Sequence, residues 1–293
     1  MAHLQAQPLP KTTPTSRRRP WGRWSVRAAA LSYLALMLII PLLVIFQDGL
    51  SQGLAGLWQA VTQPVAWAAL LLTLRTSAMM VLINTIMGTL TAYVLVRYEF
   101  PGKPLLNALV DLPLAIPTLV TGVMLVILYG PQQPIGAWLE RTLGWRIIFA
   151  PPGIVLALLF VTFPFVVRAV QPVLLSLDRS VEDAAATLGA GPWTIFRRVT
   201  LPPLALPLTS GALLSFARAV GEFGAIIIVA GNIPLRTQTA AVYVWGEVES
   251  ENRFGASAVS VALLAIAFTL ILLVDLLQSR RETSQGRQQK GAR

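Results

Sequence analysis

The sequence predicts an all-α polytopic membrane protein with about six transmembrane helices. The first ground is composition: apolar residues make up 55% of the 293 residues, charged residues only 12%, and the mean hydropathy is +0.66. A water-soluble domain carries about 25% charged residues, roughly twice that share. The second ground is that apolar stretches of about 20 residues, the length that crosses the hydrocarbon core, recur along the chain.

The predicted spans are residues 28–46, 66–96, 105–128, 153–170, 204–230 and 256–277. The first is too long for the apolar region of a cleaved signal peptide, and no small-residue cleavage site follows it, so we expect a retained span. Pro113 and Pro117 remove backbone donors from the third span, which we expect to be kinked. In the fifth, Gly211, Ser215 and Ala219 recur every four residues, a spacing that lets helices approach closely.

These spans divide the chain into a membrane domain and two polar tails. Residues 1–24 are rich in Pro, Thr and Gln and are predicted to be a disordered tail. Residues 25–278 form the transmembrane domain, and residues 279–293 form a second tail, also predicted to be disordered. The loop at about residues 171–203 is the informative connection, and the others are short.

Basic residues predict the side of the membrane that each loop faces. Most of the 23 Lys and Arg residues lie in the two tails and in the loops after the second and fourth spans. Because cytoplasmic loops carry an excess of Lys and Arg, these segments and both termini are predicted to be cytoplasmic. This asymmetry absorbs most of the net charge of +10, so the charge gives no reason to expect a nucleic-acid partner.

The residue inventory excludes several chemistries. Cysteine is absent and the single histidine is His3, so we expect no catalytic triad and no metal site. No G-x-x-x-x-G-K-[ST] phosphate-binding loop occurs, and none of Lys11, Lys103 and Lys290 has that context. We expect no catalytic residue and no cofactor in this chain. If ATP drives its function, a separate protein binds the ATP and Mg²⁺.

The loop between the fourth and fifth spans contains a predicted helix of about two turns. Ser180 is a suitable N-cap, and Glu182 and Asp183 lie in the first turn, where the helix dipole favours negative charge. Gly189 suits the left-handed residue that ends a helix. Val181, Ala184, Ala185 and Leu188 form a small apolar face. Such a short helix needs a partner surface, which could be the membrane, its own bundle or another protein.

The spacing in this loop resembles the EAA loop of ABC-importer permeases. That pattern is Glu-Ala-Ala, three residues, Gly, nine residues and Ile-x-Leu-Pro, and here Asp183 and Val199 stand for Glu and Ile. The resemblance implies a coupling helix that docks into a groove on an ATP-binding subunit and transmits its closure to the spans. The residues that it assigns to ATPase coupling are Glu182, Asp183, Ala184, Ala185, Leu188, Gly189, Leu201 and Pro202.

Four further stretches are similar to permeases of the sulfate/thiosulfate importer. They are RYEFPGK (97–103), DLPLAIPTLVTG (111–122), PFVVRAVQPVL (164–174) and ARAVGEFGAIIIVAGNIPLRTQT (217–239), and the similarity covers about residues 24–278. Within these stretches, the segments AIPT (115–118) and GNIPLRTQT (231–239) look more like the T than the W subunit of that importer. The resemblance implies the type I (MetI-like) importer permease fold in a bacterial-type inner membrane. The alternative is a molybdate, tungstate or other oxyanion permease, although those are usually shorter.

The resemblance also implies partners. They are a W-type sulfate permease subunit, two copies of an ABC ATPase subunit, an extracytoplasmic or periplasmic sulfate-binding protein and membrane lipid. An ion-gradient-driven secondary transporter would also explain the spans and the charge asymmetry, but not the loop. A membrane enzyme would need a cluster of His, Asp, Glu or Ser at one face, and none is seen in the sequence.

Polar residues inside the predicted spans are candidates for the substrate path. Arg218 and Glu222 lie four residues apart within the fifth span, where charges are expensive and usually functional. They form either a structural bridge or a site in which Arg218 faces an anion and Glu222 holds it in place. Thr118 and Thr121 follow Pro117 and offer hydroxyls either to an oxyanion or to the interrupted backbone.

Overall fold

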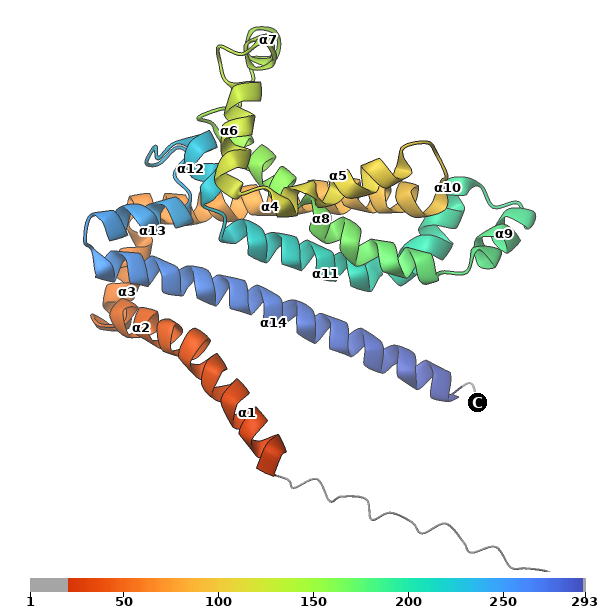
Figure 1. The fold of residues 1–293 in the computed structure, drawn as a ribbon, viewed down its shortest axis with the longest axis horizontal. Helices are drawn as coiled ribbons and strands as arrows, with labels where there is room; N and C mark the ends of the chain where they lie inside the picture. The colour runs from red at the N-terminus through yellow and green to blue at the C-terminus, as the bar shows by residue number, and fades with distance from the viewer. Residues whose placement is uncertain (1–20, 292–293) are drawn as a thin grey trace, which may run out of the picture. The chain divides into compact units, whose positions relative to one another are not determined.

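The computed structural model describes the backbone of residues 21–291 and the side chains of residues 24–272. Most of the predicted N-terminal tail, residues 1–20, lies outside the described residues. Every secondary-structure element among the described residues is a helix (Figure 1). The helices are α1 Trp21–Leu34, α2 Ile40–Gly49, α3 Gly53–Thr62, α4 Pro64–Arg97, α5 Lys103–Ala115, α6 Thr118–Tyr129, α7 Pro134–Leu143, α8 Pro151–Ser176, α9 Arg179–Thr187, α10 Pro192–Ile195, α11 Leu201–Val220, α12 Gly224–Ala230, α13 Ala240–Glu249 and α14 Arg253–Gly291, with π-helical turns η1 Ala35–Ile39 and η2 Phe196–Thr200.

The chain forms two compact units, residues 1–44 and 45–293. The boundary between the units falls within α2, which α1 joins through η1, and the helical segment Trp24–Gly49 is long and apolar enough to cross a membrane. The other helices that meet this criterion among the described residues are α4, α8, the segment Pro192–Val220 and α14 up to Leu272. Counting the bent pair α5 and α6 as one broken span gives up to six. This agrees with the predicted number.

The core of the second unit is built on α4, α8 and α11, which lie side by side (Figure 1). Small residues allow the close approach. A Cβ on Gly88 would lie 2.9 Å from Cβ of Val166, and one on Gly211 would lie 3.0 Å from Cα of the same residue. Gly211, Ser215 and Ala219 are all buried, as the spacing on the fifth span predicts.

A buried polar contact joins the same three helices. The side-chain amide of Asn84 on α4 donates to the hydroxyl of Thr162 on α8 at 2.8 Å. The hydroxyl of Ser215 on α11 reaches the carbonyl of Thr162 at 3.5 Å. Since no water is available in the hydrocarbon core to satisfy such groups, these contacts fix the register of the three helices.

The third predicted span is broken, not only kinked. α5 ends at Ala115, α6 begins at Thr118, and the two axes differ by 112°. Ile116 adopts an extended conformation (φ −86°, ψ 127°), and Pro117 is the N-cap of α6. A residue before proline is sterically disfavoured in the helical region, so the break falls where the sequence places Pro117. The other proline, Pro113, is accommodated inside α5.

Two further boundaries differ from the prediction. The fifth span ends at Val220, ten residues before the predicted end at 230, and residues 221–223 separate it from α12. Glycine at position 221 weakens the helix there, and the carboxylate of Glu222 accepts from the backbone of Ala225 instead. At the other end of the chain, α14 continues to Gly291 through the segment predicted to be a disordered tail. Arg, Glu, Gln and Lys in that segment are good helix formers.

Candidate functional site

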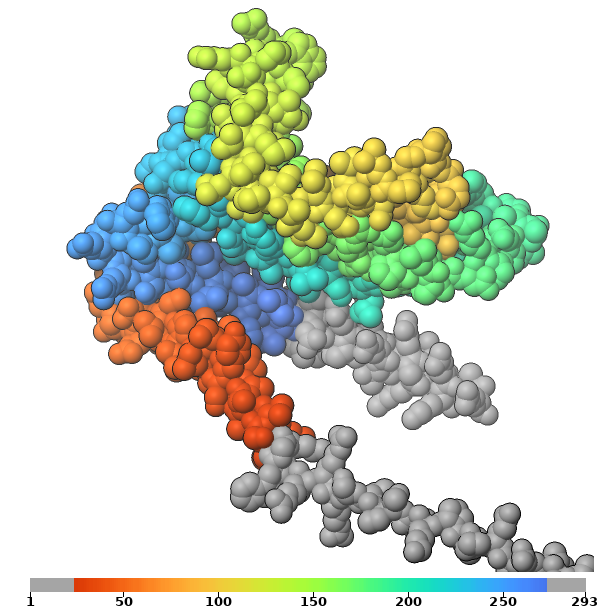
Figure 2. All heavy atoms as spheres, in the orientation of Figure 1, coloured from red at the N-terminus to blue at the C-terminus, as the bar shows by residue number. Residues whose placement is uncertain are grey.

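The loop between α8 and α11 lies at one end of the second unit, with α12 and α13 at the opposite end (Figure 1). Figure 2 shows it at the surface of that end. Its helix α9 starts at Arg179, not at Ser180, because Asp178 is the N-cap: its carboxylate accepts from the backbone N–H of Ser180 at 2.9 Å. This hydrogen bond holds the pKa of Asp178 below its usual value. The predicted cap at Ser180 is therefore wrong by two residues.

The end of α9 is as predicted. Gly189 has φ +84°, the left-handed region that favours glycine. Its N–H donates to Ala186 at 2.9 Å, and the N–H of Ala190 donates to Ala185 at 3.1 Å. These two bonds form a Schellman motif, which satisfies carbonyls at the helix end and turns the chain sharply away.

The inner face of α9 is tied to the end of α4. Glu182 Oε1 lies 2.9 Å from Nη2 of Arg97 and accepts from the hydroxyl of Thr200 at 2.8 Å. The two charged side chains are only 15% and 8% exposed. Arg179 donates to the carbonyls of Val96 at 3.1 Å and Arg97 at 2.9 Å. We name this group the α9 clamp. The sequence singled out Glu182 but gave no signal for its partner Arg97.

The outer face of α9 and the turn after it present apolar side chains that no described part of the chain covers. Leu188 is 88% exposed, and Val181 and Trp193 are also exposed. Asp183 and Ala184 are exposed beside them, and Ala185 is half-buried. Of the motif's last residues, Leu201 is half-buried and Pro202 is exposed at the start of α11. The loop therefore has a pinned inner face and an open apolar outer face.

The clamp predicts different effects for two neighbouring acidic residues. Glu182→Ala leaves the guanidinium of Arg97 buried without its partner, which we expect to lower the free energy of unfolding by about 3 kcal/mol. Asp183→Ala removes an exposed charge and is expected to change it by less than about 0.5 kcal/mol. Thermal unfolding of the purified protein measures both. Equal destabilisation by the two substitutions would contradict the clamp.

The charged pair of the fifth span lies at the break between α11 and α12. Nη1 of Arg218 is 2.6 Å from Oε2 of Glu222. The Glu222 side chain is 2% exposed, and its other oxygen accepts from the N–H of Ala225 at 2.9 Å. Arg218 remains 36% exposed. The carboxylate is thus fixed on both oxygens, while the guanidinium is partly open.

The two candidate threonines lie on α6, which packs against α12. A Cβ on Gly224 would lie 2.2 Å from the hydroxyl of Thr118, so the backbone that follows Glu222 sits directly on this side chain. Thr121 is buried, and its hydroxyl has no hydrogen-bond partner among the described residues. Arg218, Glu222 and Thr118 therefore lie around the break at 221–223, and Thr121 lies about one helical turn further along α6.

One membrane pair was missed by sequence reasoning. Arg168 on α8 donates from Nε and Nη2 to the two carboxylate oxygens of Asp111 on α5, at 2.7 and 2.6 Å. It also donates to Asn107 and Gln171. Both charged residues are visible in the sequence, but they are 57 residues apart and nothing in the pattern pairs them.

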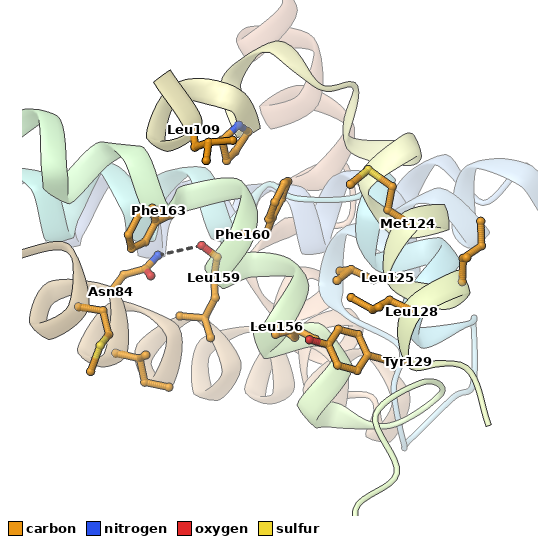
Figure 3. A pocket seen from close by; sticks show the side chains of 14 residues that line it. Asn84, Leu109, Met124, Leu125, Leu128, Tyr129, Leu156, Leu159, Phe160 and Phe163 are labelled. Carbon is orange, nitrogen blue, oxygen red and sulfur yellow. Dashed lines mark hydrogen bonds between the residues drawn. The ribbon is translucent and has the colours of Figure 1, made fainter. Parts of the chain in front are cut away.

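A largely apolar cavity of about 760 Å³ opens between α4, α8 and the α5–α6 break. In Figure 3, Asn84 and Phe163 lie on one side and Met124, Leu125 and Leu128 on the other. Its polar side chains are Asn84, whose amide donates to the carbonyl of Leu159 at 3.3 Å, and Tyr129, whose hydroxyl is also drawn in Figure 3. This cavity offers no charge to an anion and is not part of the candidate path.

A comparison with protein families gives a match over residues 84–283. The matching family is described as binding-protein-dependent transport system inner membrane component. The chain belongs to this family. As a member it is a multi-span transport component and not an enzyme, and permeases of this kind work with an ATPase and a binding protein.

Curated relatives of this permease cover most of its length. A probable sulfate transport system permease protein of Nephroselmis olivacea is 42% identical over 252 residues, which cover 86% of this chain and 88% of the relative. The sulfate transport system permease protein of a Synechocystis species is 37% identical over 274 residues, with 92% and 96% covered.

Solved structures show the same fold at low identity. The bacterial alginate ABC transporter in complex with an alginate pentasaccharide-bound periplasmic protein matches with a TM-score of 0.75 at 17% identity, covering 90% of this chain and 96% of that one. The inward-facing MetNI methionine ABC transporter matches with a TM-score of 0.52 at 18% identity, covering 75% and 95%. The permease therefore has the type I ABC importer fold that the sequence predicts.

Proposed function

We propose that this permease forms the path for sulfate or thiosulfate in an ATP-driven importer and is coupled to a separate ATPase through α9. The observation that carries the coupling is the two-sided loop: the α9 clamp fixes its inner face to α4, and its outer face exposes Leu188 and Trp193. The sulfate relatives support the substrate.

Coupling follows from this geometry. An exposed apolar side chain gains free energy when a partner surface removes it from water. Docking of Val181, Ala184 and Leu188 into an ATPase groove would place Asp183 at its rim. Movement of the ATPase would then be transmitted through Glu182 and Arg97 to the end of α4. Leu201 and Pro202 would transmit the same movement to α11.

The substrate path is proposed to run past Arg218. Its guanidinium is partly open and would attract a dianion, while Glu222, fixed by Ala225, would keep the arginine in place. Thr118 and Thr121 lie across the break on α6 and would offer hydroxyl donors to the oxyanion. The path would bind the anion weakly, with selectivity left to the binding protein.

The proposed assembly contains one W-type permease, two ATPase subunits that bind ATP and Mg²⁺, and an extracytoplasmic sulfate-binding protein. This chain would contribute no cofactor. Its transmembrane domain, residues 25–278, would lie in lipid of the inner membrane with the tails 1–24 and 279–293 in the cytoplasm. This orientation rests on the Lys and Arg asymmetry and places α9 on the cytoplasmic side.

Uptake of labelled sulfate by proteoliposomes tests the proposal. The permease, its W-type partner and the ATPase are reconstituted, and loaded sulfate-binding protein is added outside. We expect uptake that requires internal ATP, persists with a protonophore and is lost without the ATPase. Uptake that continues without the ATPase would instead show a gradient-driven transporter. Transport of molybdate or tungstate in place of sulfate would overturn the substrate and favour the other oxyanion permeases.

A further inference from the structure

The ion pair between Arg168 and Asp111 has the geometry of an oxyanion site. Two parallel N–H donors of one guanidinium meet two oxygens of one carboxylate, at 2.7 and 2.6 Å. Arginine binds sulfate-like oxyanions through the same fork of donors. The carboxylate of Asp111 therefore occupies the place that two oxygens of a tetrahedral dianion would take.

This pair lies on an open face of membrane-spanning helices. Arg168 is 31% and Asp111 48% exposed, although α8 is a membrane span and α5 belongs to the bent span. Charges within spans face a water-filled cavity or protein and not lipid. The face that carries the pair is therefore turned towards the path or towards the second permease that closes it.

The same face leads to Arg218. A hollow of about 250 Å³ beside Arg168 is also lined by Leu214, which lies one helical turn from Arg218 on α11. Ser215 meets the carbonyl of Thr162, which fixes the register of α8 and α11. With a rise of 1.5 Å per residue, the two arginines lie about 14 Å apart along the helices, with Arg168 nearer the α9 end.

The two pairs differ in how firmly the carboxylate is held. Glu222 is 2% exposed and bound on both sides, by Arg218 and by the N–H of Ala225. Asp111 is half exposed, and the hydrogen bonds that the structure describes for its carboxylate all come from Arg168. A dianion that displaces Asp111 breaks only the interaction of this carboxylate with Arg168. Displacement of Glu222 would also break its hydrogen bond to Ala225 at the start of α12.

We propose that Arg168 forms a second anion-binding site, at the cytoplasmic end of the path, which we call the Arg168 station. The carboxylate of Asp111 competes with the anion for this arginine. The inference rests on the proposed function and extends it. An anion that leaves Arg218 binds Arg168 in place of Asp111. The return of Asp111 then expels the anion towards the cytoplasm. Asn107 and Gln171 hold the arginine side chain while the carboxylate is away.

The test measures binding of labelled sulfate to the purified complex of permeases and ATPases in detergent, without binding protein. Asp111→Asn removes the competing charge and keeps the shape of the side chain, and we expect it to tighten sulfate binding about tenfold. Arg168→Gln in the same variant should remove this gain. Glu99→Gln, which neutralises an exposed partner of Lys103, is the matched control and should leave sulfate binding unchanged.

Measurements of sulfate uptake distinguish an anion-binding role of Arg168 from a salt bridge with Asp111 that serves only packing. The double variant Asp111→Asn/Arg168→Gln keeps polar side chains at both positions, so a bridge that serves only packing would leave uptake near normal. The station predicts that uptake falls at least about tenfold while ATP hydrolysis still responds to loaded binding protein. Unchanged sulfate binding in Asp111→Asn, or normal uptake in the double variant, overturns the inference alone. Failure of the unsubstituted complex to take up sulfate overturns the proposed function instead.

Discussion

Replacement of Gly189 by aspartate is expected to abolish uptake while the chain still inserts into the membrane. Gly189 has φ +84°, and a left-handed residue with a Cβ costs about 1–2 kcal/mol. A Cβ there meets nothing within 4 Å, so the substitution strains the backbone without a clash in the fold. The strain is relieved by unwinding the end of α9, and the new carboxylate lies next to Leu188 on the apolar outer face. Both changes oppose docking of the ATPase.

Gly144 provides a matched control. It also has positive φ, it also ends a helix (α7), and a Cβ there also meets nothing within 4 Å. Gly144→Asp should therefore insert and retain most of its uptake. Measurements of membrane protein level, sulfate uptake and co-purification of the ATPase distinguish the two variants. Normal sulfate uptake by Gly189→Asp would refute the role of the loop, as would equal losses in both variants.

The second large effect is expected at the charged pair of the fifth span. In the double variant Arg218→Met/Glu222→Gln, the amide oxygen of Gln can still accept from Ala225, and no uncompensated charge remains. The chain should therefore fold. Sulfate loses its cation on the path, and since a desolvated charge pair contributes about 2–5 kcal/mol to binding, uptake at low sulfate should fall about 30-fold or more.

The single variant Arg218→Met reports the structural part of the pair. It leaves the carboxylate of Glu222 buried and unpaired, which costs about 3–5 kcal/mol, so the amount of folded protein should drop. Glu99→Gln/Lys103→Met neutralises a pair of the same four-residue spacing whose glutamate is 85% exposed, and it should change neither quantity. Normal protein level together with normal uptake in Arg218→Met/Glu222→Gln would contradict the role of Arg218 in the substrate path.

The features that the sequence predicted are those set by local patterns. Gly189 ends α9 because the left-handed conformation at this position favours glycine, and the glycine of the loop motif predicts this helix end. Gly211 and Ser215 pack against α8 because small residues at a four-residue spacing fall on one helix face. The number of candidate membrane spans follows from the length of the apolar stretches.

The features that the sequence did not predict depend on contacts between distant segments. Glu182 pairs with Arg97 across 85 residues, and Arg168 pairs with Asp111 across 57. No periodicity relates such partners. The break at Pro117 was expected as a kink, but its angle of 112° is set by how α6 packs on α12. The start of α9 was misplaced because Asp178 and Ser180 are both good N-caps, and the turn before the helix decides between them.

Cross-linking from position 188 tests the central claim, that α9 docks on a separate ATPase, most directly. The chain has no cysteine, so Leu188→Cys introduces a single reactive thiol on the most exposed part of the outer face. Leu235→Cys, exposed near the opposite end of the second unit, is the control. With a thiol-reactive photo-cross-linker on the assembled importer, position 188 should give a product with the ATPase and position 235 should not. A complex that forms and transports sulfate without any product from position 188, or with an equal ATPase product from position 235, would contradict the account.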